Sequence, residues 1–230
     1  MTHETMELVI DSINDGSGTD RIFSRPLIEN VTIAKVWPEY PQGDAFNEAG
    51  YDVYFVYSED RRCIAAILDM GPDDLHVFVK KENRRQGIMT RALRAVVLPH
   101  LLRNKRTEQR VTFNSMESRG LLQKAGFTIT DDKHAVITAQ ECKKVNFVDA
   151  ELLPFLEDRK EALKKRLGKA AGLMKMACEE MELFLGGDEL GVEIEATMDY
   201  IWELRGRVED AWWAKGANTG EHNKPAIDSL

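Results

Sequence analysis

The chain has 230 residues, of which 43% are hydrophobic and 30% are charged, and its formal net charge is −8. This length exceeds the roughly 100–150 residues of a typical domain, so one large domain or a domain with an appendage is expected. The acidic balance argues against a general nucleic-acid binder, because phosphate-backbone affinity needs clustered positive charge. The chain also has no apolar run near the ~20 residues of a membrane span.

The amino-terminal stretch MTHETMELVIDS carries acidic residues where a secretory signal carries positive charge, which favours a cytoplasmic protein. The three cysteines, Cys63, Cys142 and Cys178, are odd in number and widely spaced. This pattern fits neither a disulfide framework nor a CxxC metal site. We therefore expect reduced thiols and predict no metal.

In chain order, MELVIDSI predicts a weak strand, and RIFSRPLIENVTIAKVW predicts a strand and a short helix. The runs YDVYFVYS and CIAAILDM flank the charged turn EDRR and predict a hairpin, because aromatic, β-branched and aliphatic residues dominate both runs. DLHVFVK predicts a further strand, and GIMTRALRAVVLPHLLR predicts an amphipathic helix.

The next elements complete the expected sheet. RVTFNS predicts a strand, ESRGLLQKA a short helix that Gly126 ends, and FTIT and HAVITA two more strands. Strands that alternate with helices after a hairpin predict an α/β domain with a mixed sheet over residues 1–145.

Downstream the pattern is only helical, and it predicts an antiparallel helical hairpin over residues 146–215, with Gly186 and Gly187 in the turn and a polar tail over 216–230. Each helix carries one heptad seam. The first seam consists of Leu163, Leu167, Ala170, Met174, Ala177, Met181 and Phe184, and the second of Leu190, Ile194, Thr197, Ile201, Leu204, Val208 and Ala211.

Further apolar residues lie outside these seams, and a two-helix hairpin cannot bury them. They are Met176, Leu183, Met198, Trp202, Trp212 and Trp213. We expect residues 150–214 to contact a second copy, another protein or the first domain.

The densest basic stretch, Lys80 to Arg94, lies where a strand passes through a glycine turn into a helix. A helix amino terminus exposes unsatisfied N–H groups and a positive dipole, and therefore binds phosphate readily. Gly87 allows close approach of the backbone, and Arg84 and Arg85 add charge-assisted donors. The turn is suited to a pyrophosphate, while a solvated basic face is the alternative.

Two segments carry a resemblance. VKKENRRQGIMTRAL resembles the coenzyme A pyrophosphate motif of the GNAT superfamily of N-acetyltransferases, and SMESRGLLQKAGF resembles a later segment of that family. Met89 stands where the family has a small residue. Ser115 replaces an asparagine and Leu122 a tyrosine that serves as general acid in many members. The resemblance covers roughly residues 7 to 140 and implies a GNAT-like fold.

The resemblance also implies acetyl-CoA as the co-substrate, with a small amine or a protein amine as the acceptor. The residues that would bind the cofactor lie on the strand DLHVFVK, in the basic turn with the helix start after it, and at the start of the helix ESRGLLQKA. They are Val77, Phe78, Val79, Arg84, Arg85, Gln86, Gly87, Ile88, Met89, Thr90 and Ser115.

His76 is the candidate catalytic base, because imidazole can accept a proton near neutral pH. Structural hydrogen bonding is the alternative for a strand histidine. Asp73 and Asp74 could assist His76 or bind a cationic amine, and a solvated turn is the alternative for them. With Leu122 in place of tyrosine, a second hypothesis is a degenerate GNAT-like adaptor that assembles through its carboxy-terminal helices. A phage virion component would suit that hypothesis.

Overall fold

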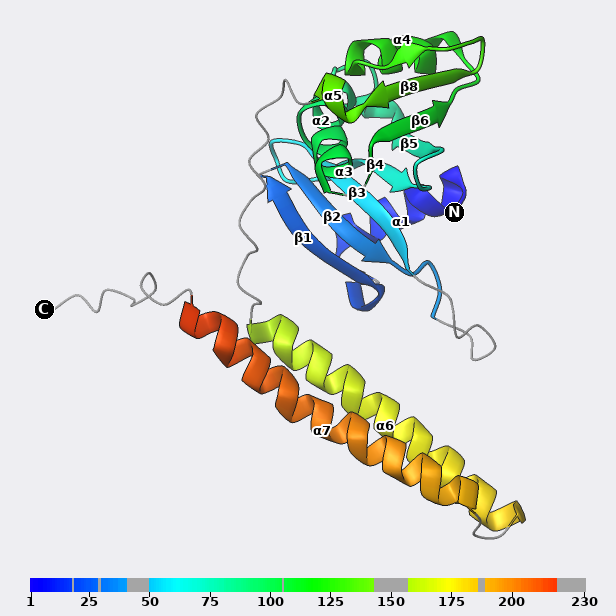
Figure 1. Cartoon of the computed structure of the whole chain (residues 1–230), viewed down its shortest axis with the longest axis vertical. Coiled ribbons are helices and arrows are strands. Elements are labelled where there is room, and N and C mark those ends of the chain that lie inside the picture. Colours follow the sequence, from blue (N-terminus) through cyan, green and yellow to red (C-terminus); the bar gives the residue numbers. More distant parts are fainter. Residues whose placement is uncertain are drawn as a thin grey trace, which may run out of the picture. The chain divides into compact units, whose positions relative to one another are not determined.

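The computed structural model describes residues 1–17, 19–28, 30–40, 50–104, 106–142, 157–185 and 189–218. The chain divides into two compact units, Met1–Glu151 and Leu152–Leu230 (Figure 1). The predicted boundary near residue 145, the turn at Gly186 and Gly187, and the tail from residue 219 onward lie outside the described residues. The first unit combines antiparallel sheets with helices, and the second contains two helices packed together.

The first unit is built on a five-stranded antiparallel sheet whose strands follow chain order. Its strands are β1 (Ile22–Ile28), β2 (Val31–Val36), β3 (Tyr51–Tyr57), β4 (Cys63–Asp69) and β5 (Leu75–Val79). Every residue of β4 from Cys63 to Leu68 is buried, so this strand is covered on both faces. That explains its unbroken apolar sequence, and the predicted β3–β4 hairpin is confirmed.

Residues His3–Asp15 form helix α1, so the strand predicted from MELVIDSI is wrong. The Thr2 side chain accepts a hydrogen bond from Thr5 N at 3.2 Å and caps the helix, and Gly16 ends it with φ +77°. Met6 and Ile10 lie four residues apart and are buried against one face of the sheet. This helical spacing is the signal that the strand prediction overlooked.

The segment predicted as a strand and a short helix is instead the β1–β2 hairpin, in which Ile22 pairs with Val36. A 3₁₀ turn, Thr19–Arg21, precedes it. Pro26 is tolerated because β1 is the edge strand, and the pairing is irregular between Pro26 and Ile28. β-Branched residues in both strands favour extended backbone over the predicted helix.

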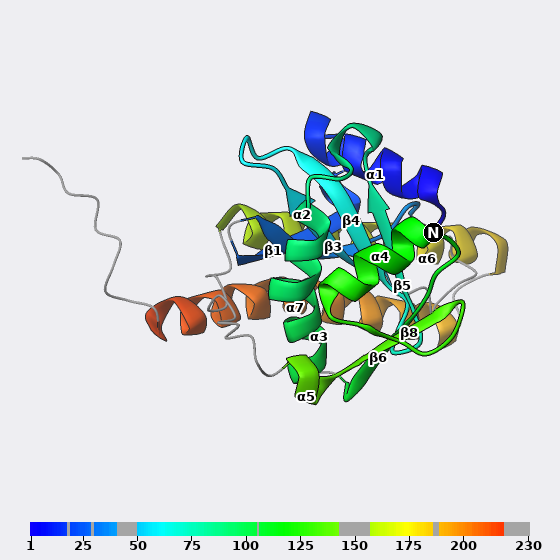
Figure 2. The same cartoon turned by 90° about the horizontal axis from the view of Figure 1, so that it is seen from above.

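The opposite face of the sheet is covered by one continuous helix, as predicted from residues 87–103. It comprises α2 (Ile88–Ala92), a π-helical turn (Leu93–Val97) and α3 (Leu98–Asn104). Its buried face packs against the residues of the sheet that point away from α1, which gives two apolar cores, one on each side of the strands (Figure 2).

The rest of the unit is a three-stranded antiparallel sheet in the order β6, β8, β7, with α4 (Met116–Ala125) before β7 and the short α5 (Ala139–Cys142) after β8. Its strands are β6 (Glu108–Thr112), β7 (Thr128–Ile129) and β8 (His134–Thr138). Gly126 ends α4 with φ +105°, as predicted. The described strands form two antiparallel sheets, so the single mixed sheet that we predicted is wrong.

The two sheets meet where the loop before β5 lies beside β6. Arg110 N donates to Pro72 O at 2.8 Å. Two residues further along β6, Thr112 N donates instead to the Asp74 carboxylate at 3.0 Å. The same carboxylate oxygen accepts from Leu75 N at 2.9 Å. Asp74 therefore occupies the position of a main-chain acceptor, and no ladder joins the described parts of β5 and β6 beyond it. Asp74 is half-buried and has this structural role, whereas its neighbour Asp73 is exposed in the turn.

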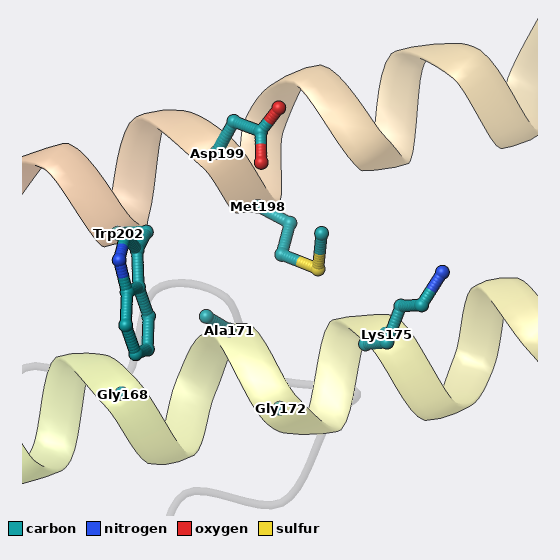
Figure 3. Close-up of a pocket in the computed structure, with 7 residues that line it drawn as sticks. All are labelled: Gly168, Ala171, Gly172, Lys175, Met198, Asp199 and Trp202. Atoms are coloured by element: carbon teal, nitrogen blue, oxygen red, sulfur yellow. The ribbon is translucent and has the colours of Figure 1, made fainter.

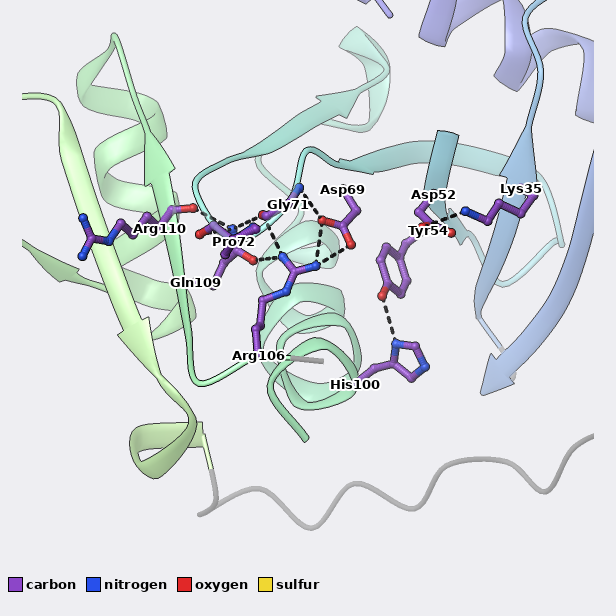
Figure 4. A network of polar contacts seen from close by, with 10 residues as sticks. All are labelled: Lys35, Asp52, Tyr54, Asp69, Gly71, Pro72, His100, Arg106, Gln109 and Arg110. Atoms are coloured by element: carbon purple, nitrogen blue, oxygen red, sulfur yellow. Dashed lines mark hydrogen bonds and ion pairs between the residues drawn. The ribbon is translucent and has the colours of Figure 1, made fainter. Parts of the chain in front are cut away.

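A buried polar network fixes this junction (Figure 4). Arg106 donates from Nη2 to both carboxylate oxygens of Asp69, at 2.7 and 3.0 Å, and from Nη1 to Gly71 O at 2.7 Å. The fully buried Gln109 donates from Nε2 to the carbonyls of Gly71 and Pro72. The end of β4, the loop and the start of β6 are thereby held together.

The second unit is an antiparallel pair of helices, α6 (Glu157–Leu185) and α7 (Glu189–Asn218). Near one end Lys160 and Lys164 of α6 donate to Glu209 of α7 at 2.8 and 2.7 Å, and the Lys160 ammonium lies 4.1 Å from the Trp212 ring centroid. At the other end, Cys178 Sγ lies 3.7 Å from Gly191 O.

Among the described side chains of α6, those of Lys160, Ala171 and Cys178 are buried, and they lie at the contact with α7. The seam residues Ala170 and Ala177 precede the buried positions by one residue and are exposed. One residue is a rotation of 100° about the helix, so these two alanines point away from the partner helix. The seam residues Leu167, Met174 and Met181 are half-buried, so the predicted seam is only partly the contact between the helices.

We predict that Glu209→Gln lowers the melting temperature of the helical hairpin at pH 7. Hydrogen bonds from Lys160, and then from Lys164, lower the pKa of Glu209 to about 2. The stabilisation is present above the unfolded value of about 4.3 and is lost as the pH falls towards 2. Circular dichroism melts at several pH values measure it.

Glu161→Gln is the matched control, because Glu161 contacts the same two lysines but lies on α6 with them and joins no second helix. We expect a smaller loss at pH 7 for this variant. Equal losses in the two variants would contradict the assignment of Glu209 as the link between the helices.

Candidate functional site

The basic turn follows β5 and has an unusual backbone. After a 3₁₀ turn, Lys81–Asn83, the chain places Arg85 at φ +64° and Gly87 at φ +74°. Left-handed backbone is rare for a residue with a side chain, while glycine adopts it without cost. Two such residues within three positions turn the chain sharply into the start of α2.

The start of α2 is open. Gly87 is the N-cap residue and no side chain caps the helix in the part of the chain that the structure describes. The first intrahelical hydrogen bond is donated by Arg91 N to Gly87 O at 3.1 Å, so the N–H groups of Ile88, Met89 and Thr90 precede it. A Cβ placed on Gly87 would meet nothing within 4 Å. An anion can therefore approach these amides closely.

Met89 does not obstruct this approach, although the family has a small residue at its position. Its side chain is 6% exposed and packs into the core with Ala92 and Leu93. The side chain therefore points into the protein, and the main-chain N–H of Met89 stays part of the open helix start.

Positive charge surrounds the open amides. Arg84 Nε donates to Val79 O at 3.1 Å, which anchors its guanidinium beside the strand end. Arg85 Nη2 lies 2.9 Å from Glu117 Oε1, but both side chains are at least 80% exposed, so this pair contributes little to stability. Gln86 Nε2 donates to Glu82 O at 3.3 Å. The arginines keep further N–H groups for an external anion.

The main chain of β5 presents alternate residues to its two sides. Met70 N donates to Asp74 O and Lys80 N to Ile64 O, and hydrogen-bonded pairs alternate along an antiparallel ladder. The polar main-chain groups of Phe78 therefore face β4, whereas those of Val77 and Val79 face the side where β6 diverges. Three residues were predicted to contact the cofactor through their main chain. The geometry favours Val77 and Val79 for this contact and does not favour Phe78, whose polar groups face β4.

Ser115 is the N-cap of α4, where its Oγ accepts a hydrogen bond from Ser118 N at 3.1 Å. The contact between Arg85 and Glu117, in the first turn of α4, connects the α2 turn to this second helix start. Ser115 therefore has a capping role, and its predicted contact with a cofactor stays a prediction.

His76 lies on β5 with its ring centroid 4.5 Å from that of His3 on α1, in an edge-on arrangement. Burial lowers the pKa of His76, His3 lowers it further, and Asp74 acts in the opposite direction. The imidazole is therefore neutral at pH 7 and can accept a proton.

Two further side chains, those of Leu122 and Cys63, are buried. Leu122 is 3% exposed and packs in the core, so a tyrosine at this position would overpack the interior rather than reach the turn. Burial raises the pKa of the Cys63 thiol to about 12, which keeps it protonated at the start of β4. All three cysteines are free and buried.

Within the described ranges, no cluster of three His, Cys, Asp or Glu side chains is placed to hold a metal ion. Among the helices that the structure describes, none is long and apolar enough to cross a membrane. A hollow of about 350 Å³ lies on the helical hairpin and not at the basic turn.

Comparisons with known proteins leave the family unassigned. No family model matches the chain, and no curated protein matches it. A dodecameric structure of spermidine N-acetyltransferase from Vibrio cholerae is similar with a TM-score of 0.39 and 8% identity, covering 64% of this chain and 94% of that chain.

We predict that Gly87→Ala destabilises the first unit by about 1 kcal/mol, because alanine at this left-handed φ is strained by roughly 1–2 kcal/mol. Gly120→Ala is the control: Gly120 lies within α4, its added Cβ also meets nothing within 4 Å, and its φ is not left-handed. That variant should be neutral or more stable by up to about 1 kcal/mol. Hydrogen exchange of the β4 amides reports both changes, and equal effects would argue against strain at Gly87.

Proposed function

We propose that the first unit is a GNAT-like N-acetyltransferase domain that binds acetyl-CoA and transfers the acetyl group directly to an amine. One observation carries the proposal: the uncapped start of α2, where Gly87 at φ +74° and the flanking Arg84 and Arg85 surround free amides. Among common phosphate sites, the turn lacks both the GxGxxG and the GKS/GKT sequences, which argues against a dinucleotide or P-loop site.

The residues fit a pyrophosphate with an extended arm. The N–H groups from Gln86 to Thr90 and the two arginines would hold the diphosphate. The outward main chain of Val77 and Val79 would hydrogen-bond the amide-bearing pantetheine arm, because an extended ligand can add to an unpaired strand edge. Asp74 keeps that edge unpaired by ending the contact between β5 and β6.

Direct transfer forms a C–N bond to the acetyl carbon and breaks its C–S bond. The amine loses a proton, and the departing thiolate gains one to become the free thiol. His76, neutral at pH 7, is the proposed acceptor of the amine proton. Leu122 stands at the position of the family's tyrosine and is in the core, so solvent is the proposed source of the thiol's proton.

The acceptor class stays a prediction, either a small amine or a protein amine. The adaptor hypothesis is favoured by a different observation, the apolar residues that the helical hairpin leaves exposed, among them Leu183 at 83% and Trp213 at 62%. Binding of acetyl-CoA without transfer would support a degenerate domain. The virion location also stays a prediction.

We predict that calorimetry on the full chain detects binding of coenzyme A and acetyl-CoA. Arg84→Ala and Arg85→Ala should each weaken binding about tenfold, because a charge-assisted hydrogen bond contributes roughly 1.5–3 kcal/mol. Arg62→Ala, at an exposed arginine in the β3–β4 turn, removes the same charge and should leave affinity unchanged.

Inorganic pyrophosphate serves as a second ligand in the same experiment. The proposal expects it to bind more weakly than coenzyme A and to depend on the same arginines. The absence of heat at millimolar coenzyme A, with folded and monodisperse protein, would overturn the proposal. An equal loss of affinity in Arg62→Ala would show that the effect of the Arg84 and Arg85 variants comes from net charge alone.

A further inference from the structure

The predicted heptad residues line one side of the helical hairpin, which we call the heptad face. Its members are Leu163, Leu167, Ala170, Met174, Ala177, Met181 and Phe184 of α6 with Ile194, Thr197, Ile201, Leu204, Val208 and Ala211 of α7. None of the described ones is fully buried, and Ala170, Ala177 and Phe184 are exposed. Eight of the thirteen members, among them Leu167, Met174 and Ile201, are half-buried, so the hairpin itself covers this face only in part.

Charge is segregated along the hairpin. All ten lysines and arginines between Glu157 and Asn218 lie outside residues 176–204, whereas nine aspartates and glutamates lie within that range. The helices are antiparallel, as the Lys160–Glu209 and Cys178–Gly191 contacts show. The hairpin therefore has a basic end and an acidic end.

A stripe of three residues spaced by seven flanks the heptad face on α7. Glu193 lies towards the acidic end, Tyr200 in the middle and Arg207 towards the basic end. Arg207 Nη1 donates to Tyr200 Oη at 3.4 Å, and Tyr200 is 52% exposed. Asp199 and Trp202 line a groove with Ala171, the midpoint of α6 (Figure 3), and Tyr200 lies between them in the sequence.

We propose that the heptad face binds a second copy of this chain in an antiparallel arrangement, which forms a four-helix bundle about a two-fold axis near Tyr200. The acidic end of each copy then covers the basic end of the other, and Arg207 of one copy meets Glu193 of the second copy. A parallel arrangement would place like charges together. This proposal is independent of acetyl transfer.

The area is adequate for a stable dimer. Helices of 29 and 30 residues are about 43–45 Å long, and two packed helices present a face about 20 Å wide. The heptad face then offers about 850 Å² per copy, close to the roughly 800 Å² per partner of a standard interface. In a four-helix bundle, each helix also buries its apolar stripe in a shared core.

The hairpin has a second surface that competes as an interface. Gly168, Ala171 and Gly172 of α6 form a groove with Met198, Asp199 and Trp202 of α7, and Trp202 and Met198 point towards α6 (Figure 3). None of these residues belongs to the heptad face. A variant on this side, Trp202→Ser, therefore separates the two surfaces.

Sedimentation velocity of the full chain tests the proposal. We expect a dimer at micromolar concentration, and a loss of dimer in Ala170→Glu, which places two like charges near the axis. Ala196→Glu is the same substitution at an exposed position of α7 outside the heptad face, and it should leave the dimer intact. Circular dichroism confirms that each variant keeps its helices.

Charge reversal tests the orientation. Arg207→Glu and Glu193→Lys should each weaken dimerisation about tenfold, because the two-fold axis duplicates every contact. The double variant carrying both changes restores opposite charges only in the antiparallel arrangement and should recover the dimer. A monomer at all concentrations, an unrecovered double variant, or a dimer lost in Trp202→Ser but kept in Ala170→Glu would overturn the proposal.

Discussion

The separation of β5 from β6 depends on one carboxylate. Asp74 Oδ1 accepts hydrogen bonds from Thr112 N and from Leu75 N, so the side chain takes the place of a main-chain acceptor at the point where a parallel ladder would continue. Arg106, paired with Asp69 and bonded to the loop, holds that point in position. A buried ion pair of this kind costs about 3–5 kcal/mol when one partner is removed. The result is an unpaired strand edge directly before the basic turn.

The turn depends on this edge for its direction. Val79 O accepts from Arg84 Nε, so the guanidinium is fixed to the end of β5 before the chain enters the left-handed residues Arg85 and Gly87. The same geometry exposes the first amides of α2 and buries the Met89 side chain. Strand edge, arginines and amides thus follow one another along the chain, which is why we propose ligand binding through the main chain and the arginines.

The sequence predicted the parts of the fold where local signals and packing agree. The β3–β4 hairpin, the helix after Gly87 and the cap at Gly126 follow from residue type alone. Helix α1 differs from the predicted strand because Met6 and Ile10 follow the helical spacing of four residues, a weak signal in so short an apolar segment. The roles of Asp74 and Gln109 depend on contacts between segments far apart in the chain, which no local pattern contains. Likewise, the rotation of the heptad face was not visible until Ala171 and Cys178 were seen at the helix contact.

The most direct test of the proposed function is the response of individual amides to ligand. On addition of coenzyme A to isotope-labelled full-length protein, nuclear magnetic resonance should show the largest shifts for the N–H groups of Ile88, Met89 and Thr90, with Val77 and Val79 also affected. The Phe78 amide, which faces β4, should change little. Shifts confined to the helical hairpin, or none at saturating ligand, would contradict the assignment of the turn as a pyrophosphate site.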